Sequence, residues 1–277
     1  MIAFPQAKIN LGLNVVSRRP DGYHNLETVF YPVPLCDVLE VLPMDSAFPC
    51  DTGCDLKVTG LCIEGDEQQN LVARAYHMLK AERSQMGRFH IHLHKVIPSQ
   101  AGMGGGSSDG ATMMLLLNEM CALGFTQDEL KERAARLGAD CAFFIMGRPA
   151  YAEGIGDRLT PIDLSLKGWH LAVVRPNVAV STKEAYSLVT PTAPQMNCRD
   201  IVTQLPVGQW RDVLVNDFEK SVIALHPVIG QVKEQLYALG AEYSAMSGSG
   251  SAVFGLFRHA VDVSEHFPGM LTALMTL

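Results

Sequence analysis

A glycine-rich segment, IPSQAGMGGGSSD at residues 97–109, joins an apolar strand pattern to an apolar helix pattern and constrains this sequence more than any other feature. Glycines let backbone N–H groups turn toward an anion without interference from a Cβ atom. A helix that follows adds unpaired N–H groups and the positive end of its dipole, which together favour phosphate. A flexible linker can share this composition, but a linker would not lie directly between a strand and an apolar helix. The segment therefore predicts a phosphate-binding loop.

The spacing of this loop excludes two familiar nucleotide-binding patterns. The P-loop pattern GxxxxGK is absent, because Ser-Ser-Asp follows the glycines. The dinucleotide pattern GxGxxG fails because Ser107 stands where its third glycine is required. A dehydrogenase would also place this loop after the first strand of a repeated βαβ array, which the preceding residues do not resemble. The nucleotide is therefore not identified by either pattern.

Composition and charge narrow the class of protein. The 277 residues suggest about two domains, and 48% apolar residues are enough for sizeable cores. The formal net charge of −7 disfavours nucleic acid as a partner. The most apolar stretch, residues 111–125, is interrupted by Asn118 and Glu119 and is shorter than the roughly 18 residues of a membrane span. We expect a soluble, cytoplasmic protein without a secretory leader, a membrane partner or a nucleic-acid partner.

Two clusters contain residue types that bind metals. They are the thiols of Cys50, Cys54 and Cys62 and the alternating imidazoles of His90, His92 and His94. The thiols lack a second CxxC-type pair or a suitably spaced histidine. The imidazoles share one face of a predicted strand, where a half-exposed sheet face is the simpler interpretation. We expect neither cluster to be a metal site.

The hydrophobic pattern predicts a mixed α+β chain. Strands are predicted over residues 7–16, 26–33, 37–42, 89–97, 150–161, 169–176 and 252–257. Helices are predicted after residue 69, with Asn70 as N-cap, and over 111–123, 126–138, 216–225 and 228–239. Residues 190–200 are predicted as a loop. A break in the pattern near residues 163–168 predicts two domains, 1–163 and 164–277.

Three segments resemble, in the expected order, the signatures of the GHMP kinase superfamily, which includes galactokinase, homoserine kinase and mevalonate kinase. They are PQAKINL at residues 5–11, the glycine-rich loop, and MSGSGSAVF at residues 246–254. The resemblance implies a two-domain α+β fold, with an ATP-binding N-terminal domain like a ribosomal protein and a ferredoxin-like C-terminal α/β sandwich. It also implies ATP as co-substrate, with Mg²⁺ expected.

Further segments resemble one branch of this superfamily. They are RRPDGYHNLETVF at 18–30, LGAD at 137–140, VSTKEAY at 180–186 and NDFE at 216–219. This branch phosphorylates a small molecule, cytidine-diphosphate-linked methylerythritol, on the non-mevalonate route to isoprenoid precursors. A kinase for mevalonate or homoserine, or a non-catalytic nucleotide-binding relative, remains an alternative. The segments at 18–30 and 180–186 argue against the first, and retention of Lys8 and Asp140 argues against the second.

Lys8 and Asp140 are the predicted catalytic residues. Both lie beside apolar runs, where a lone buried charge is costly and a Lys–Asp pair is tolerable. Lys8 would keep the Asp140 carboxylate ionised, so that it could accept the proton of the acceptor hydroxyl. The resemblance assigns these two residues to that task.

The resemblance also assigns binding roles. ATP binding is expected at Asn70, Lys95, Pro98, Ser99, Gln100, Ala101, Gly102, Met103, Gly104, Gly105, Gly106, Ser107 and Ser108. Substrate binding is expected at Asn10, Tyr23, His24, Tyr186, Gly248, Ser249 and Gly250. Asp109 is the acidic residue beside the loop, but the Mg²⁺ ligands are left open, as is the choice between monomer and homodimer. Two departures from the usual pattern, Gly110 for alanine and Cys141-Ala142 for Val-Pro, remove no reactive group.

Overall fold

The computed structural model describes residues 1–62 and 69–277, and the chain forms two compact units. Unit 1 comprises residues 1–7, 35–99 and 104–147, and unit 2 comprises residues 8–34, 100–103 and 148–277. Each unit is therefore built from separate stretches of chain, and the glycine-rich loop contributes to both. The division by sequence order at residue 163 stays a prediction.

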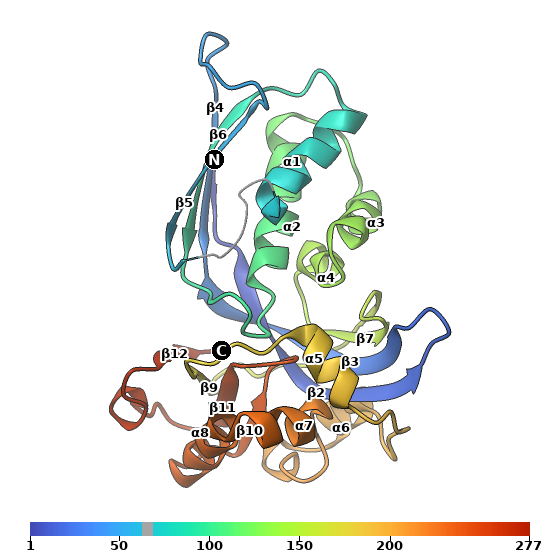
Figure 1. Cartoon of the computed structure of the whole chain (residues 1–277), viewed down its shortest axis with the longest axis vertical. Coiled ribbons are helices and arrows are strands. Elements are labelled where there is room, and N and C mark those ends of the chain that lie inside the picture. Colours follow the sequence, from blue (N-terminus) through green and yellow to red (C-terminus); the bar gives the residue numbers. More distant parts are fainter. Residues whose placement is uncertain (63–68) are drawn as a thin grey trace. The chain divides into compact units, whose positions relative to one another are not determined.

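Unit 1 is a sheet covered on one face by helices (Figure 1). Within the described residues the sheet has four strands in the order β1 (Ile2–Ala3), β4 (Val38–Pro43), β6 (Phe89–Lys95) and β5 (Cys54–Gly60). The helices are α1 (Leu71–Glu82), α2 (Gly105–Met120), α3 (Gln127–Leu137) and α4 (Cys141–Met146). β4 pairs antiparallel and β5 parallel with β6. The core lies between this sheet and these helices.

Strand β6 confirms the predicted alternation of its two faces. Phe89, Ile91 and Leu93 are buried in the core, whereas the intervening histidines lie on the more exposed face. There the Thr59 hydroxyl lies 2.8 Å from Nε2 of His92 and 3.0 Å from Nδ1 of His94. No group of three or more His, Cys, Asp or Glu residues in the described part of the chain could hold a metal ion. The imidazoles of His92 and His94 instead lie within hydrogen-bonding distance of the Thr59 hydroxyl on β5.

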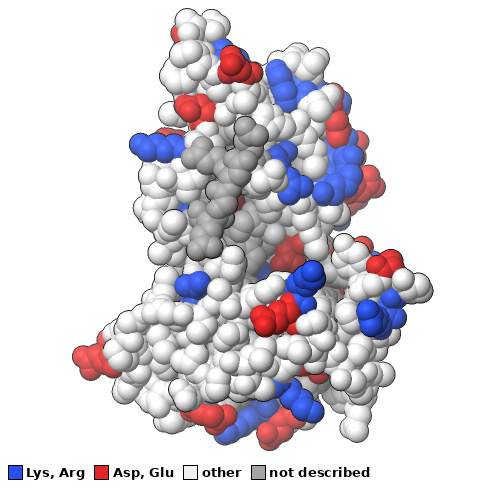
Figure 2. All heavy atoms as spheres, in the orientation of Figure 1, with Lys and Arg blue, Asp and Glu red and all other residues white. Residues whose placement is uncertain are grey.

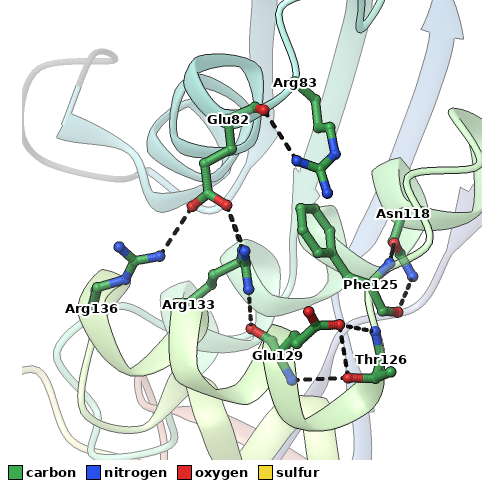
Figure 3. Close-up of polar contacts among 8 residues, drawn as sticks. All are labelled: Glu82, Arg83, Asn118, Phe125, Thr126, Glu129, Arg133 and Arg136. Carbon is green, nitrogen blue, oxygen red and sulfur yellow. Dashed lines mark hydrogen bonds and ion pairs between the residues drawn. The ribbon is translucent and has the colours of Figure 1, made fainter.

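Local capping signals set the starts of two helices as predicted. Asn70 caps α1 by accepting a hydrogen bond from the Val72 N–H at 2.9 Å. Thr126 and Glu129 form the predicted capping box at the start of α3 (Figure 3). Such caps satisfy N–H groups that have no partner inside the helix.

Charged side chains connect α1 to α3 at the surface of unit 1. Figure 3 shows Glu82 of α1 between two arginines of α3, Arg133 at 2.6 Å and Arg136 at 3.1 Å. The Arg133 guanidinium lies 4.0 Å from the centre of the Phe125 ring. On the face shown in Figure 2, basic and acidic side chains are interspersed. These contacts join α1 to α3 at the surface.

Unit 2 contains most of one sheet and all of another. In the described residues the first has the order β2 (Gln6–Arg18), β3 (His24–Cys36), β7 (Ala150–Gly154) and β8 (Arg158–Pro161). The second is antiparallel, in the order β10 (Tyr243–Met246), β11 (Val253–Phe257), β9 (His170–Arg175) and β12 (Leu271–Thr276). The helical segments are α5 (Thr182–Leu188), α6 (Cys198–Gln204), η2 (Val207–Gln209), α7 (Phe218–Leu225), α8 (Pro227–Ala238) and η3 (Ser264–His266). The predicted α+β class is confirmed.

Several element boundaries differ from the prediction. The strand predicted over 150–161 is a hairpin of β7 and β8, because Gly154 and Gly156 adopt positive φ values that reverse the chain. The loop predicted over 190–200 ends early, since α6 begins at Cys198. β5, α4, α5, β10 and β12 were not predicted. No helix in residues 1–62 and 69–277 combines the length and apolar character that a membrane crossing requires.

Candidate active site

In unit 1 the glycine-rich loop leads into the N-terminus of α2. The N-cap is Gly104, with a φ of 71° that favours glycine, and no side chain caps the helix. A Cβ at Gly105 would lie 2.9 Å from Cγ2 of Ile97, so this turn packs directly on the end of the preceding strand. The first N–H groups of α2 have no partner inside the helix, and the helix dipole is positive here. This end of α2 can bind phosphate.

The predicted helix start at residue 111 was wrong by six positions. α2 begins at Gly105 and includes Ser107 and Ser108 in its first turn. Glycine has low helix propensity, and this hid the start in the sequence pattern. The helix therefore places its N–H groups inside the loop itself.

A buried charge cluster lies below this loop in unit 1. The Lys95 ammonium donates to the Asp37 carboxylate and, at 2.7 Å, to Oδ2 of Asp109. Asp37 also accepts hydrogen bonds from the backbone N–H groups of Val96 at 2.5 Å and Ile97 at 2.8 Å. Lys95 was predicted to contact ATP, and the structure places its side chain in this cluster, 3.3 Å from the position of a Cβ at Gly105. The cluster thus holds the end of β6 where the loop begins.

Burial raises the pKa of Asp109 to about 7, and the charge of Asp37 adds to this effect while Lys95 opposes it. Oδ1 of Asp109 has no hydrogen-bond partner. Asp109 is thus held in the cluster through Oδ2 alone.

One of the two sequence departures, Gly110, has a structural reason. A Cβ at Gly110 would lie 2.9 Å from both Cδ2 of Leu137 and Cβ of Leu71, so glycine permits the close approach of α1 to α2. Cys141 is buried, and this burial raises the pKa of its thiol to about 11. Its neighbour Asp140, half-buried, is the residue from which α4 begins. Neither departure alters Asp140 itself.

In unit 2, three segments that are distant in sequence meet. The Lys8 N–H donates to the Met103 carbonyl at 3.0 Å, which joins β2 to the loop. The Ser247 hydroxyl donates to the Gly102 carbonyl at 2.9 Å, which joins the C-terminal glycine segment to the same loop. Gly102 has a φ of 72°, and a Cβ there would lie 1.8 Å from the Ser247 carbonyl oxygen. The contact therefore requires glycine.

Side chains of β2 and β3 contact the buried ammonium of Lys8. The Lys8 ammonium donates to Oδ1 of Asn10 at 2.6 Å and lies 4.9 Å from the centre of the Phe30 ring. Nδ2 of Asn10 donates to the Thr28 hydroxyl at 3.0 Å, which in turn donates to the Gly12 carbonyl at 2.5 Å. Lys8 is therefore buried as expected. Thr28 was not singled out in the sequence, because only the pairing of β2 with β3 brings it to Asn10.

Two of the three residues predicted to recognise cytosine lie together in unit 2. The rings of His24 and Tyr186 are stacked, with centres 5.2 Å apart, and Phe218 meets the edge of Tyr186 at 4.8 Å. Tyr23 lies in the turn between β2 and β3 and is 63% exposed. The structure thus provides an aromatic stack of the kind that can accept a planar base.

Asn216 supports the C-terminal glycine segment, and it was not predicted as a site residue. Nδ2 of Asn216 donates to the carbonyls of Met246 and Gly248, each at 2.8 Å, and its Oδ1 accepts from the Phe218 N–H at 3.0 Å. The Ser249 hydroxyl lies 3.1 Å from that of Thr182 at the start of α5. Asn216 lay within the NDFE motif, which was the available signal.

Comparison with known proteins identifies the class that this fold and site define. The GHMP kinases N terminal domain matches residues 70–148, and the GHMP kinases C terminal domain matches residues 207–267. The structure of a mevalonate kinase from Methanococcus jannaschii has a TM-score of 0.66 at 13% identity, over 100% of this chain and 98% of its own, a likeness of fold alone.

Closer relatives narrow the class. A protein from Parabacteroides distasonis named 4-diphosphocytidyl-2-C-methyl-D-erythritol kinase is 51% identical over 96% of this chain and 94% of its own. A crystal structure titled 4-(cytidine 5'-diphospho)-2C-methyl-D-erythritol kinase has a TM-score of 0.83 at 33% identity, over 100% of this chain and 99% of its own. The chain therefore belongs to the family of 4-diphosphocytidyl-2-C-methyl-D-erythritol kinases.

Proposed function

We propose that this protein is an ATP-dependent kinase that phosphorylates the 2-hydroxyl of 4-diphosphocytidyl-2-C-methyl-D-erythritol. This reaction belongs to the non-mevalonate route to isoprenoid precursors. The 51% identity to a relative of that name, over nearly the whole length of both chains, carries the proposal. The phosphate-binding geometry at the start of α2 supports the ATP-dependent part of it.

The catalytic roles follow from the chemistry of phosphoryl transfer. The N-terminal turn of α2 binds the ATP phosphates. Asp140 accepts the proton of the 2-hydroxyl while the oxygen of that hydroxyl bonds to the γ-phosphorus. The bond from this phosphorus to the β–γ bridging oxygen breaks, which releases ADP. The Lys8 ammonium stabilises the charge that develops on the transferred group. Mg²⁺ is expected to arrive bound to the ATP phosphates, because it usually keeps few protein ligands.

The substrate is recognised by the aromatic stack and the glycine segment. His24 and Tyr186, with Tyr23 nearby in sequence, bind the cytosine ring by stacking and by the hydrogen-bonding edge of the imidazole. Asn10 and the segment Gly248–Gly250 shape the pocket for the acceptor. The proposed division by sequence order assigns ATP binding to a domain of residues 1–163 and places a C-terminal domain at residues 164–277; the two compact units do not follow this division. The protein acts in the cytoplasm, where ATP is available.

Release of ADP by the purified protein tests this function. Offered 4-diphosphocytidyl-2-C-methyl-D-erythritol, mevalonate or homoserine in turn, the enzyme should release ADP at a substantial rate only with the cytidyl substrate. Tyr186→Ala should raise the KM for that substrate about tenfold or more, since base stacking is worth about 1–3 kcal/mol, and should leave the KM for ATP unchanged. Turnover of mevalonate or homoserine at a comparable rate would contradict the proposal.

A further inference from the structure

We propose that Thr28 is a positioning residue for Lys8, acting through the side-chain amide of Asn10. The inference rests on the catalytic role proposed for Lys8 and adds a residue that has no direct contact with the ammonium. Its basis is a chain of hydrogen bonds in unit 2 that runs from the Lys8 ammonium to the Gly12 carbonyl.

Each bond in this chain has one permitted direction. The Gly12 carbonyl can only accept, so the single proton of the Thr28 hydroxyl is donated to it at 2.5 Å. The Thr28 oxygen can then only accept at its other contact, which requires the NH₂ group of Asn10 there, at 3.0 Å. The amide oxygen of Asn10 is thereby turned toward Lys8, whose ammonium has donors and no acceptor. A backbone carbonyl therefore decides which end of the Asn10 amide faces Lys8.

Burial makes this directionality matter. Lys8 is 3% exposed, Asn10 2% and Thr28 0%. Bulk water is therefore poorly placed to replace a lost partner in this chain. Without the Thr28 hydroxyl, the NH₂ group of Asn10 loses its acceptor, and only the Lys8 ammonium still favours the orientation in which the amide oxygen faces it. Rotation by half a turn would place the NH₂ group against that ammonium, where no hydrogen bond can form.

The backbone holds two members of this chain of hydrogen bonds, Gly12 and Asn10. Gly12 has a φ of 68°, and a Cβ there would lie 2.6 Å from Cδ1 of Leu214 and 2.7 Å from Sγ of Cys198, so its carbonyl lies in a closely packed part of β2. The Asn10 N–H donates to the Ser247 hydroxyl at 3.3 Å. The side-chain amide of Asn10 is thus the part of this chain without a backbone anchor, and the Thr28 hydroxyl holds its NH₂ group.

Two substitutions at one position separate this role from packing. Thr28→Val keeps the shape of the side chain and removes the hydroxyl, whereas Thr28→Ser keeps the hydroxyl and removes a methyl group. We expect Thr28→Val to lower kcat about tenfold or more, as for the loss of a buried hydrogen bond, with the KM for ATP unchanged. Thr28→Ser should stay within about threefold of the native kcat. A folded Thr28→Val enzyme with native kcat would overturn the inference, as would a larger loss in Thr28→Ser.

A measurement on Lys8 itself distinguishes failure of this inference from failure of the proposed function. The rate at which a small acylating reagent modifies Lys8, followed by mass spectrometry with exposed Lys183 as internal reference, should rise several-fold in Thr28→Val and stay native in Thr28→Ser. Unchanged labelling of Lys8 in Thr28→Val would overturn the positioning role even if the enzyme were inactive on every alcohol offered. If labelling of Lys8 rises in Thr28→Val but the Lys8→Ala enzyme has native kcat, the positioning role stands and the catalytic role of Lys8 is contradicted.

Discussion

At the scale of single residues, the buried cluster of unit 1 contains two carboxylates and one ammonium. One ammonium, that of Lys95, serves the carboxylates of both Asp37 and Asp109. Asp37 has two further donors from the backbone, whereas Oδ1 of Asp109 has none. A buried charge without sufficient partners is costly, and burial accordingly raises the pKa of Asp109.

Asp109→Asn should therefore change how stability depends on pH. The pKa of Asp109 is raised to about 7 in the folded protein from an ordinary value of 3.8. The folded state thus binds more protons between these values, and the contribution of Asp109 to stability falls as pH rises toward 7, by at most about 1.4 kcal/mol per pH unit. In urea denaturation from pH 5 to 8, Asp109→Asn should remove this decline and be no less stable than the native protein at pH 8.

Asp37→Asn is the matched control for this experiment. It removes the charge that faces Lys95 and weakens the acceptor of two backbone N–H groups. We expect a loss of about 3–5 kcal/mol, as for removal of one partner of a buried ion pair. An Asp109→Asn protein that kept the native pH dependence would contradict the assignment of the proton to Asp109.

Residues of this cluster were only partly predictable. Asp109 and Lys95 stood beside a recognisable loop, but Asp37 had no local signal. Its approach to Lys95 follows from the register of β4 and β6, in which Val38 pairs with His94. Asp37 and Lys95 are 58 positions apart in the sequence. The strand register that brings them together depends on the packing of the whole sheet. Lys8 could be recognised from its motif, whereas Thr28, although it lies in the segment at 18–30, is brought to Asn10 only by the pairing of β2 with β3.

At the scale of elements, sequence reasoning succeeded where the signal was local. The caps of α1 and α3 are set by side chains within a few residues, and both were predicted. The start of α2 was missed because its first turn consists of glycine and serine, which the hydrophobic pattern does not include. The short helices α4, α5 and α6 span only six or seven residues each, too few for a clear periodicity.

Two glycines of the loop should respond oppositely to alanine. Gly102→Ala introduces a Cβ 1.8 Å from the Ser247 carbonyl at a positive φ, which should destabilise the protein by about 2–5 kcal/mol and raise the KM for ATP. Gly106→Ala, in the first turn of α2, meets no atom closer than 4.0 Å and should be stabilising by about 0.5–1 kcal/mol. Thermal denaturation and ATP kinetics on both variants measure these effects. Equal stability of the two proteins would contradict the close packing of Gly102 on Ser247.

At the scale of the whole molecule, the proposed catalytic residues come from different compact units. Lys8 belongs to unit 2 and Asp140 to unit 1, and the chain passes from one unit to the other within the glycine-rich loop. The family could nevertheless be recognised from sequence, because its motifs are spread from residue 5 to residue 254. The division into two compact units could not be predicted from the sequence, because each unit combines stretches that are distant along the chain. Whether both residues serve one chemical step is therefore a question about the complete protein.

A double-mutant cycle on Lys8 and Asp140 answers it. Asp140→Asn is nearly isosteric but cannot accept a proton in the same way, so kcat should fall about 10²–10⁴-fold while the affinity for ATP stays native. Lys8→Ala should also be severe, because it removes a cation from the developing phosphoryl charge. If both act in one step, the double variant should be little worse than the worse single variant. A structural role would instead lower the melting temperature of Asp140→Asn and spare turnover in the folded fraction, so kcat and Tm are measured on the same preparation. Independent losses that multiply in the double variant would show that the two residues act separately.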